Sequence, residues 1–291
     1  MKKVLVALLA LAILSSGAVF ASEYVYDYTE EDIMIDAGDH QIPATITVPV
    51  GTDGETFPAV VMLHGNGSTR HEAGNAYDYT APEMAKAGIA TIRYDYIGNG
   101  DSSEDYIDFT YDKGIEDAVT CYEYLENVSA VDTERVGIMG WSQGGRLTLL
   151  TASRNDVFKS ALTWAGAFEQ KDEKDEYEIA LQNGYYEVTY DWREPLKQSP
   201  AYYECAMGID YHEEAANVKV PYMIIQGTED TSVVPETAIE IQKALVTPRR
   251  PRSTGSRTAT IHSTCSQEIP QLWRRLRQQP SHGSLQHFDR F

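Results

Sequence analysis

The strongest constraint on the fold is a regular alternation of apolar and helical segments along residues 33–245. Apolar runs at 58–63 and 89–96 each end in a glycine-rich turn, which is typical of a buried strand that leads into a loop. Strands that alternate with helices predict an α/β fold with a mostly parallel sheet and helices on both faces. We further expect strands at 33–35, 44–50, 135–139, 159–164 and 221–225, and helices at 79–87, 112–128, 143–153 and 235–245.

Residues 169–218 interrupt this alternation. The stretch begins with an acidic run at 169–178, which we interpret as a solvated face. Six aromatic residues follow, and they could present flat apolar faces with polar tips to a ligand or pack the insertion onto the sheet. We expect a cap over the sheet. The aromatic residues are Tyr185, Tyr186, Tyr190, Trp192, Tyr202 and Tyr203.

A Gly-Trp-Ser-Gln-Gly sequence at 140–144 joins an apolar strand pattern to a helical pattern. The pattern G-x-S-x-G alone is weak, but a strand on one side and a helix on the other are what a nucleophile elbow requires. Glycines at its ends allow the strand and the helix to approach each other closely. Ser142 would then lie at a helix N-terminus, where the helix dipole favours developing negative charge.

Four motifs occur in order along the chain. They are His-Gly-Asn at 64–66, Arg-Tyr-Asp-Tyr and Gly-Asn-Gly-Asp-Ser within 93–102, the elbow at 140–145, and Gly-Thr-Glu-Asp with Val-Val-Pro within 227–235. In these motifs the chain resembles the α/β-hydrolase fold and, within it, the bacterial feruloyl (cinnamoyl) esterases. The resemblance implies a serine carboxylic-ester hydrolase that works through an acyl-enzyme, without cofactor or metal, on small-molecule or polysaccharide-linked esters of plant cell walls.

The resemblance makes Ser142 the nucleophile and Asp230 the acid of a catalytic triad, with backbone N–H groups of Asn66 and Gln143 as the oxyanion hole. The place of Asp230 in the sequence supports this role, because Asp230 follows an apolar strand pattern and can orient an imidazole at the carboxyl edge of the sheet. Its neighbour Glu229 competes for this role, and a plain capping role for Asp230 also stays open.

The base is the missing member. Among the histidines after Asp230, only His262 has the separation that the resemblance implies, 32 residues, whereas His282 and His287 lie further on. Residues 248–252 are Arg- and Pro-rich where a last apolar strand is due, so we expect the C-terminal strand and helix to be missing. His64 is expected to brace its own loop.

Two further classes stay open beside the esterase. One is a non-catalytic or inactivated α/β-hydrolase-fold protein that lacks a working histidine. The other is a serine peptidase, which we disfavour because 291 residues leave no room for a propeller or other gating domain.

The N-terminus has the pattern of a secretory signal peptide. Lys2 and Lys3 precede an apolar run at 4–14, and small residues end at Ala21, where we expect cleavage. The run is short for a membrane span, so we expect a secreted or periplasmic product without a membrane anchor. The hydrolase domain would then be 22–246, with the cap at 169–218.

Charge and cysteine content disfavour nucleic-acid binding, a disulfide-rich fold and a metal site. A net charge of −20 disfavours binding to nucleic acid. Three cysteines allow at most one disulfide, Cys121 fits a buried free thiol in a helical pattern, and Cys205 and Cys265 lie in irregular sequence. No CxxC or Cys/His spacing indicates a metal site.

The composition changes abruptly at residue 247. Residues 247–291 contain 8 Arg, no Lys and no Tyr, and carry a net charge of +6, whereas residues 1–246 carry −26. The last strand, base and helix that the resemblance implies are missing from the same stretch. We interpret 247–291 as an atypical basic tail that is translated out of frame.

Codon arithmetic makes the frame hypothesis testable by sequencing the gene. With permitted synonymous codons, the third base of each codon and the first two of the next can read Asp-Gly-Asp-His-Ser across residues 257–262, and a stop across 288–289. We expect the gene to encode this histidine loop in the shifted frame. Nucleotides that do not permit the loop would refute the hypothesis and leave His262 as the base.

Overall fold

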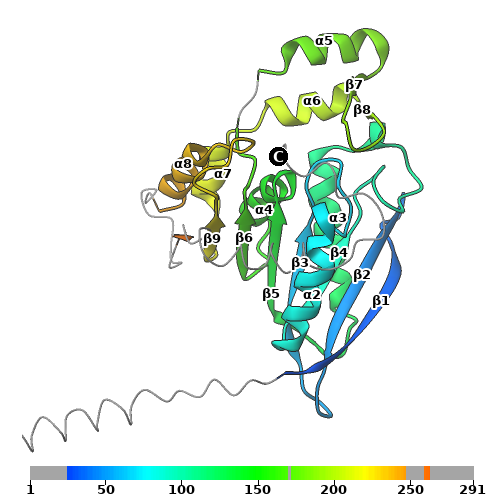
Figure 1. Ribbon diagram of the computed structural model, residues 1–291, viewed down its shortest axis with the longest axis vertical. Coiled ribbons are helices and arrows are strands. Elements are labelled where there is room, and N and C mark those ends of the chain that lie inside the picture. The colour runs from blue at the N-terminus through cyan, green and yellow to red at the C-terminus, as the bar shows by residue number, and fades with distance from the viewer. Residues whose placement is uncertain (1–24, 170–171, 247–258, 263–291) are drawn as a thin grey trace, which may run out of the picture.

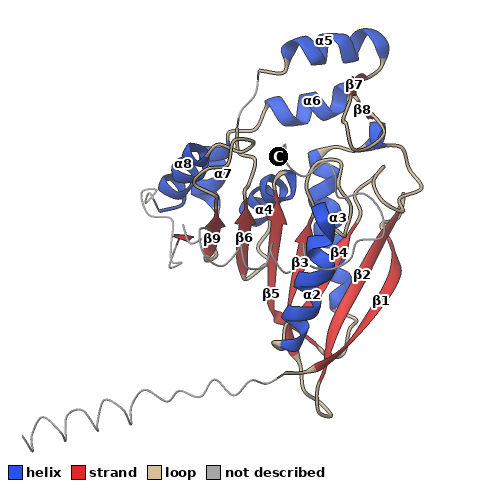
Figure 2. Ribbon diagram, in the orientation of Figure 1, coloured by secondary structure: helices blue, strands red, loops and turns tan. Residues whose placement is uncertain are grey.

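Eight strands form one mixed sheet in the computed structural model, which describes residues 25–169, 172–246 and 259–262 (Figures 1 and 2). Their order is β1-β2-β4-β3-β5-β6-β9-β10. β2 is antiparallel to both β1 and β4, and every later pairing in this sheet is parallel. The strands are β1 (Asp27–Asp36), β2 (Gln41–Val50), β3 (Phe57–Leu63), β4 (Ala90–Tyr94), β5 (Val131–Trp141), β6 (Ser160–Trp164), β9 (Tyr222–Ile225) and β10 (Ala259–His262).

Alternate side chains of the central strands pack into separate apolar clusters. Val61 and Ile138 belong to the main core, whereas their neighbours Met62 and Met139 pack with Tyr77 of α2. Successive side chains of a strand point to opposite faces, so both faces of the sheet are buried. The helices of the body are α2 (Ala76–Lys86), α3 (Tyr111–Leu125), α4 (Gln143–Arg154), α7 (Tyr211–Asn217) and α8 (Pro235–Val246), with short 3₁₀ turns η1 (Ala73–Asn75) and η2 (Tyr106–Asp108).

The cap lies beyond the carboxyl ends of the parallel strands (Figure 2). It contains α5 (Lys174–Asn183), the antiparallel pair β7 (Tyr186–Val188) and β8 (Leu196–Gln198), and α6 (Pro200–Met207). α7 falls within the predicted insertion, but it packs against α4 and α8 in the helix layer of the body. An ion pair between Arg154 on α4 and Glu214 on α7, with a nitrogen–oxygen distance of 2.7 Å, joins these two helices.

The predicted α/β fold is confirmed, and each expected strand and helix of residues 33–245 is present with shifted ends. The prediction that the last strand is missing is wrong. Ala259–His262 pairs in parallel with β9, because β-branched Thr260 and Ile261 suit a strand and β9 offers an edge there. The expected missing helix, the signal peptide and Cys265 fall outside the described residues. Cys205 lies on α6, and Cys121 is a buried free thiol.

A buried ion pair joins the β1–β2 turn to α3. His40 Nε2 lies 3.1 Å from an oxygen of Asp117, and the two side chains are 6% and 2% exposed. Asp39 is 2.8 Å from the other ring nitrogen. The interaction with Asp117, and secondarily that with Asp39, raises the pKa of His40 to about 9.

Because the pKa of His40 is raised above its unfolded value, the pair contributes stability that is complete below about pH 6.5 and is lost as pH rises through about 9. We therefore expect His40→Gln to lower the free energy of unfolding at pH 6 more than at pH 9.5, as measured by urea denaturation. A difference that stays constant between pH 6 and pH 9.5 would contradict this prediction.

Candidate active site

Ser142 occupies a sharp turn between β5 and α4. Its backbone is left-handed (φ 53°, ψ −115°), a conformation that a residue with a side chain adopts only when its surroundings impose it. Glycine makes this possible, because a Cβ at Gly144 would lie 2.2 Å from the carbonyl oxygen of Leu63 at the end of β3. Ser142 N–H donates to Trp164 O at 3.1 Å, which fixes the turn against β6.

The loop after β3 is held by a neutral histidine. The Tyr96 N–H donates to His64 Nε2 at 3.2 Å, so the ring proton is on Nδ1, which donates to Gly65 O at 2.7 Å. Tyr96 stacks on the imidazole with ring centroids 3.8 Å apart. Complete burial lowers the pKa of His64 to about 4, so the ring is uncharged at neutral pH. The expected bracing role of His64 is what these contacts describe.

These contacts determine the direction of one backbone amide. Gly65 O accepts from His64 and also from Ser68 N–H at 3.1 Å. In a trans peptide the N–H points opposite to the C=O, so Asn66 N–H points away from both donors. The loop lies beside the serine, because a Cβ at Gly65 would be 3.5 Å from Ser142 Cβ. Loop and elbow therefore meet at Ser142.

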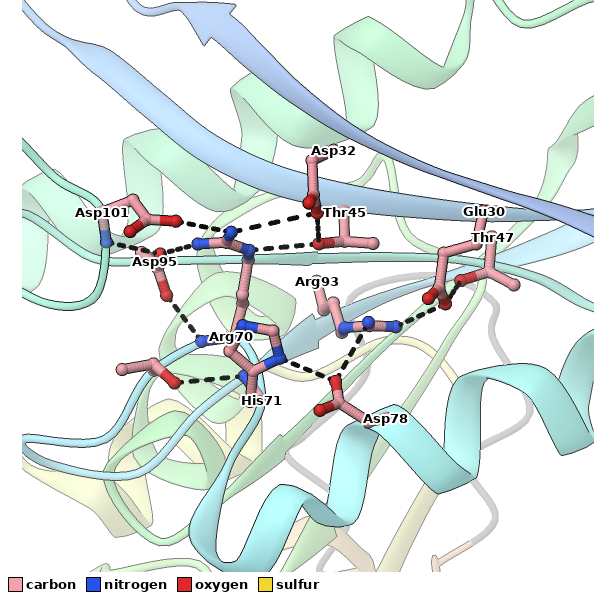
Figure 3. Close-up of polar contacts among 11 residues, drawn as sticks. Glu30, Asp32, Thr45, Thr47, Arg70, His71, Asp78, Arg93, Asp95 and Asp101 are labelled. Atoms are coloured by element: carbon pink, nitrogen blue, oxygen red, sulfur yellow. Dashed lines mark hydrogen bonds and ion pairs between the residues drawn. The ribbon is translucent and has the colours of Figure 1, made fainter. Parts of the chain in front are cut away.

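A network of charged side chains centred on the buried Arg70 and Asp95 anchors the far end of this loop (Figure 3). Asp95 accepts from the backbone N–H of Arg70 at 2.6 Å, from its guanidinium, and from Asp101 N–H at 3.0 Å. Arg70 also donates to Asp101 at 2.6 Å and to Thr45 Oγ1 at 3.1 Å. Asp101 is thus an ion-pair partner, a role that the sequence did not indicate.

Glu72 is a second group that the sequence did not reveal. Its carboxylate accepts from Gly65 N–H at 2.5 Å and from Ala73 N–H at 2.8 Å. Its backbone is left-handed (φ 59°), and burial raises its pKa. A polar residue in a loop gives no sequence signal for such burial. Together Arg70 and Glu72 fix the loop that carries Asn66.

Arg146, in the first turn of α4, joins the elbow to the entry of the cap. Its Nε donates to Ala167 O at 2.6 Å, and Nη2 donates to Glu169 O at 3.3 Å. Ala167 N–H in turn donates to Ser142 O at 3.0 Å. The guanidinium also contacts the hydroxyl of Tyr111. This contact set was missed, because an arginine in a helix usually faces solvent.

Asp230 follows β9 and is engaged in its own turn. One carboxylate oxygen accepts from Ser232 and Val233 N–H at 2.9 and 3.0 Å, and the other accepts from Gln226 Nε2 at 3.2 Å. These bonds close a turn before α8, which begins at Pro235, and none of them comes from an N–H group of the helix. Glu229 is exposed. The backbone of His262 ends β10 in register with Ile225, the last residue of β9.

The site elements are thus of two kinds. Asn66 and Gln143 belong to segments that meet at Ser142, whereas Asp230 follows β9 and the backbone of His262 ends the neighbouring strand β10 at the carboxyl edge. Among the described residues, no group of three or more His, Cys, Asp or Glu side chains is arranged to hold a metal ion. None of the helices in the described ranges is long and apolar enough to cross a bilayer.

The sheet order and the turn at Ser142 define an α/β hydrolase, a class that structural comparison also gives. Est1E from Butyrivibrio proteoclasticus with ferulic acid bound superimposes with a TM-score of 0.62 at 19% identity, covering 84% of this chain and 96% of that one. Acylaminoacyl peptidase from Pyrococcus horikoshii gives 0.57 at 21% identity, covering 79% of this chain and 36% of that one.

Sequence comparison gives the family. A sequence profile of the prolyl oligopeptidase family matches residues 75–262, well over half of the chain, and the chain belongs to this family. The putative hydrolase YtaP of Bacillus subtilis is 26% identical over 150 residues, which cover 44% of this chain and 50% of that protein. The similarity to this protein and to two other curated relatives covers at most half of the length of each relative.

The network around Arg70 predicts unequal effects for its two carboxylates. Asp95→Asn removes the charge of a fully buried partner and leaves a cation buried, which should lower the free energy of unfolding by about 3 kcal/mol. Asp101→Asn changes a side chain that is 71% exposed and pairs with the same guanidinium, so about 0.5 kcal/mol is expected. Urea denaturation measures the free energy of unfolding of both variants. Equal losses would show that the burial of Asp95 does not determine the size of the effect.

Proposed function

We propose that this hydrolase is an exported serine carboxylic-ester hydrolase that works through an acyl-enzyme. Ser142 is the nucleophile, Asp230 the acid, His262 the base, and Asn66 and Gln143 N–H form the oxyanion hole. The observation that carries the proposal is the left-handed backbone of Ser142 beside the loop of Gly65. Export rests on the N-terminal sequence pattern alone.

The reaction follows from this arrangement. Ser142 Oγ attacks the ester carbonyl carbon while the base accepts the hydroxyl proton. The carbonyl oxygen gains negative charge and accepts hydrogen bonds from Asn66 and Gln143 N–H, each worth about 3 kcal/mol of barrier. The C–O bond to the alcohol breaks as the base returns the proton, and water then cleaves the acyl-enzyme by the same steps.

The register of the last two strands supports His262 as the base. β9 leads to Asp230 five residues after Ile225, and His262 is level with Ile225 at the same edge of the sheet. An acid and a base at the carboxyl ends of adjacent strands are suited to a triad with the elbow. The alternative, a chain without a working base, is what the frame hypothesis implies for residues 247–291.

Aromatic side chains of the cap favour phenolic acyl groups as the substrate class. Tyr202 and Tyr203 are buried and pack the cap, so they offer no face to a ligand. Trp192 is 43% exposed, and its ring lies 5.3 Å from that of Tyr190. Exposed aromatic faces beside a polar hydroxyl suit a hydroxycinnamoyl ring, and the structural neighbour Est1E has ferulic acid bound.

A peptidase is the second candidate function, favoured by membership of the prolyl oligopeptidase family and by the fold of acylaminoacyl peptidase. The same nucleophile and oxyanion hole would serve amide hydrolysis. Turnover of an acylaminoacyl p-nitroanilide above that of a p-nitrophenyl ester would favour it.

The nucleophile is tested by removing one hydroxyl. Ser142→Ala should lower the hydrolysis of a p-nitrophenyl ester by more than about 1000-fold, because the proposed acyl-enzyme forms on its Oγ. A fluorophosphonate probe should label Ser142 in the wild type. Ser153→Ala is the matched control, since Ser153 lies on the same helix and its hydroxyl contacts Leu150 O and Glu214. Labelling elsewhere, or activity that survives in Ser142→Ala, would refute the assignment.

The substrate class is tested with two methyl esters. If aromatic faces of the cap bind the acyl group, kcat/KM for methyl ferulate should exceed that for methyl butyrate by at least about 10-fold. Trp192→Leu should reduce the first value more than the second. Equal values for the two esters in the wild type would leave a general carboxylesterase.

A further inference from the structure

The cap contacts the oxyanion loop through a few polar side chains. Asn66 Nδ2 donates to the hydroxyl of Tyr190 at 2.8 Å, and Asn66 Oδ1 accepts from the hydroxyl of Tyr106 at 3.1 Å. Tyr190 belongs to the cap, whereas Tyr106 belongs to η2 of the body. Both ends of the Asn66 amide are therefore held, one by each part of the molecule.

Arg193 makes the second contact. Its Nη1 donates to Gly67 O at 2.5 Å and to Asn99 Oδ1 at 2.7 Å, and its Nε donates to Glu194 O at 3.0 Å. The fit is close, because a Cβ at Gly67 would lie 3.0 Å from Arg193 Cδ. Gly67 has φ 69°, a conformation suited to glycine. The three acceptors are neutral oxygens, so these hydrogen bonds hold the loop without pairing the guanidinium with a negative charge.

These contacts surround the peptide units that carry the proposed oxyanion donor. Asn66 N–H lies between Gly65, held from the body by His64 and Glu72, and Gly67, held from the cap by Arg193. Tyr106 also interacts with the side chain of Gln143, the other proposed donor residue. A small change in direction of such a donor is expensive, since misplacement by about 1 Å costs about 100-fold in rate.

We propose that Tyr190 and Arg193 of the cap are positioning residues for the oxyanion hole, and that docking of the cap, together with the contacts from the body at Gly65, holds the Asn66 N–H in its direction. The inference rests on the proposed function, because it assigns Asn66 N–H to the oxyanion. The cap then does more than bind the acyl group, since its contact with residues 66 and 67 completes the catalytic geometry.

The test separates a positioning role from a structural one by two readouts. Tyr190→Phe removes one hydroxyl and Arg193→Met removes the guanidinium, and we expect each to lower kcat for p-nitrophenyl acetate about 10-fold with KM changed less than about 2-fold. Arg193→Lys should recover part of the loss. In the same variants, hydrogen exchange of the backbone amides of residues 64–70 should be faster than in the wild type.

Two matched variants control for loss of any polar contact. Tyr177→Phe removes a cap hydroxyl that bonds Glu204, and Arg135→Met removes an exposed arginine that pairs with Asp132. Both should keep wild-type kcat and wild-type exchange at 64–70.

Each outcome decides between the two proposals. A wild type that hydrolyses no ester refutes the proposed function, and the inference with it. An active wild type whose Tyr190→Phe and Arg193→Met variants keep wild-type kcat refutes the inference alone, even if exchange at 64–70 increases, because the contacts are then structural. Loss of kcat with unchanged hydrogen exchange at residues 64–70 also refutes the inference, because Tyr190 and Arg193 then do not act by holding this loop.

Discussion

The close approach of the turn at Ser142 to the end of β3 is the constraint on which the site depends. A side chain at Gly144 would collide with Leu63 O, and one at Gly140 would collide with Gly144 O at 2.2 Å. Only glycine lets strand β5, helix α4 and the loop after β3 meet at this distance. The left-handed backbone of Ser142 follows from that packing, and so does the proximity of Gly65 to the serine.

Buried polar groups then hold the loop around this point. A neutral His64 turns the Gly65–Asn66 peptide, Glu72 binds Gly65 N–H, and the Arg70–Asp95 pair fixes the loop's far end. Buried charges of this kind contribute little net stability, but removing one partner is costly. Under the proposed function they hold the Asn66 N–H in place before any substrate binds, which is the preorganisation that oxyanion stabilisation requires.

The sequence predicted the elements better than the contacts. Apolar runs that alternate with helical patterns, and a serine between glycines where a strand meets a helix, indicated the α/β fold and the elbow, because these signals lie in residues that are neighbours in the sequence. Arg70, Glu72 and Arg146 could not be foreseen, since their partners lie in other segments and a polar residue in a loop or helix usually faces solvent. β10 was missed because its four residues follow an Arg- and Pro-rich stretch that argues against a strand.

The central claim is that Ser142 faces two backbone N–H groups fixed before the reaction begins. A crystal structure of the protein after reaction with a methyl fluorophosphonate tests it most directly. The account predicts phosphorus bonded to Ser142 Oγ, with one phosphonyl oxygen about 3 Å from the backbone nitrogens of both Asn66 and Gln143. A phosphonyl oxygen that points away from both nitrogens, or phosphorus on another residue, would contradict it.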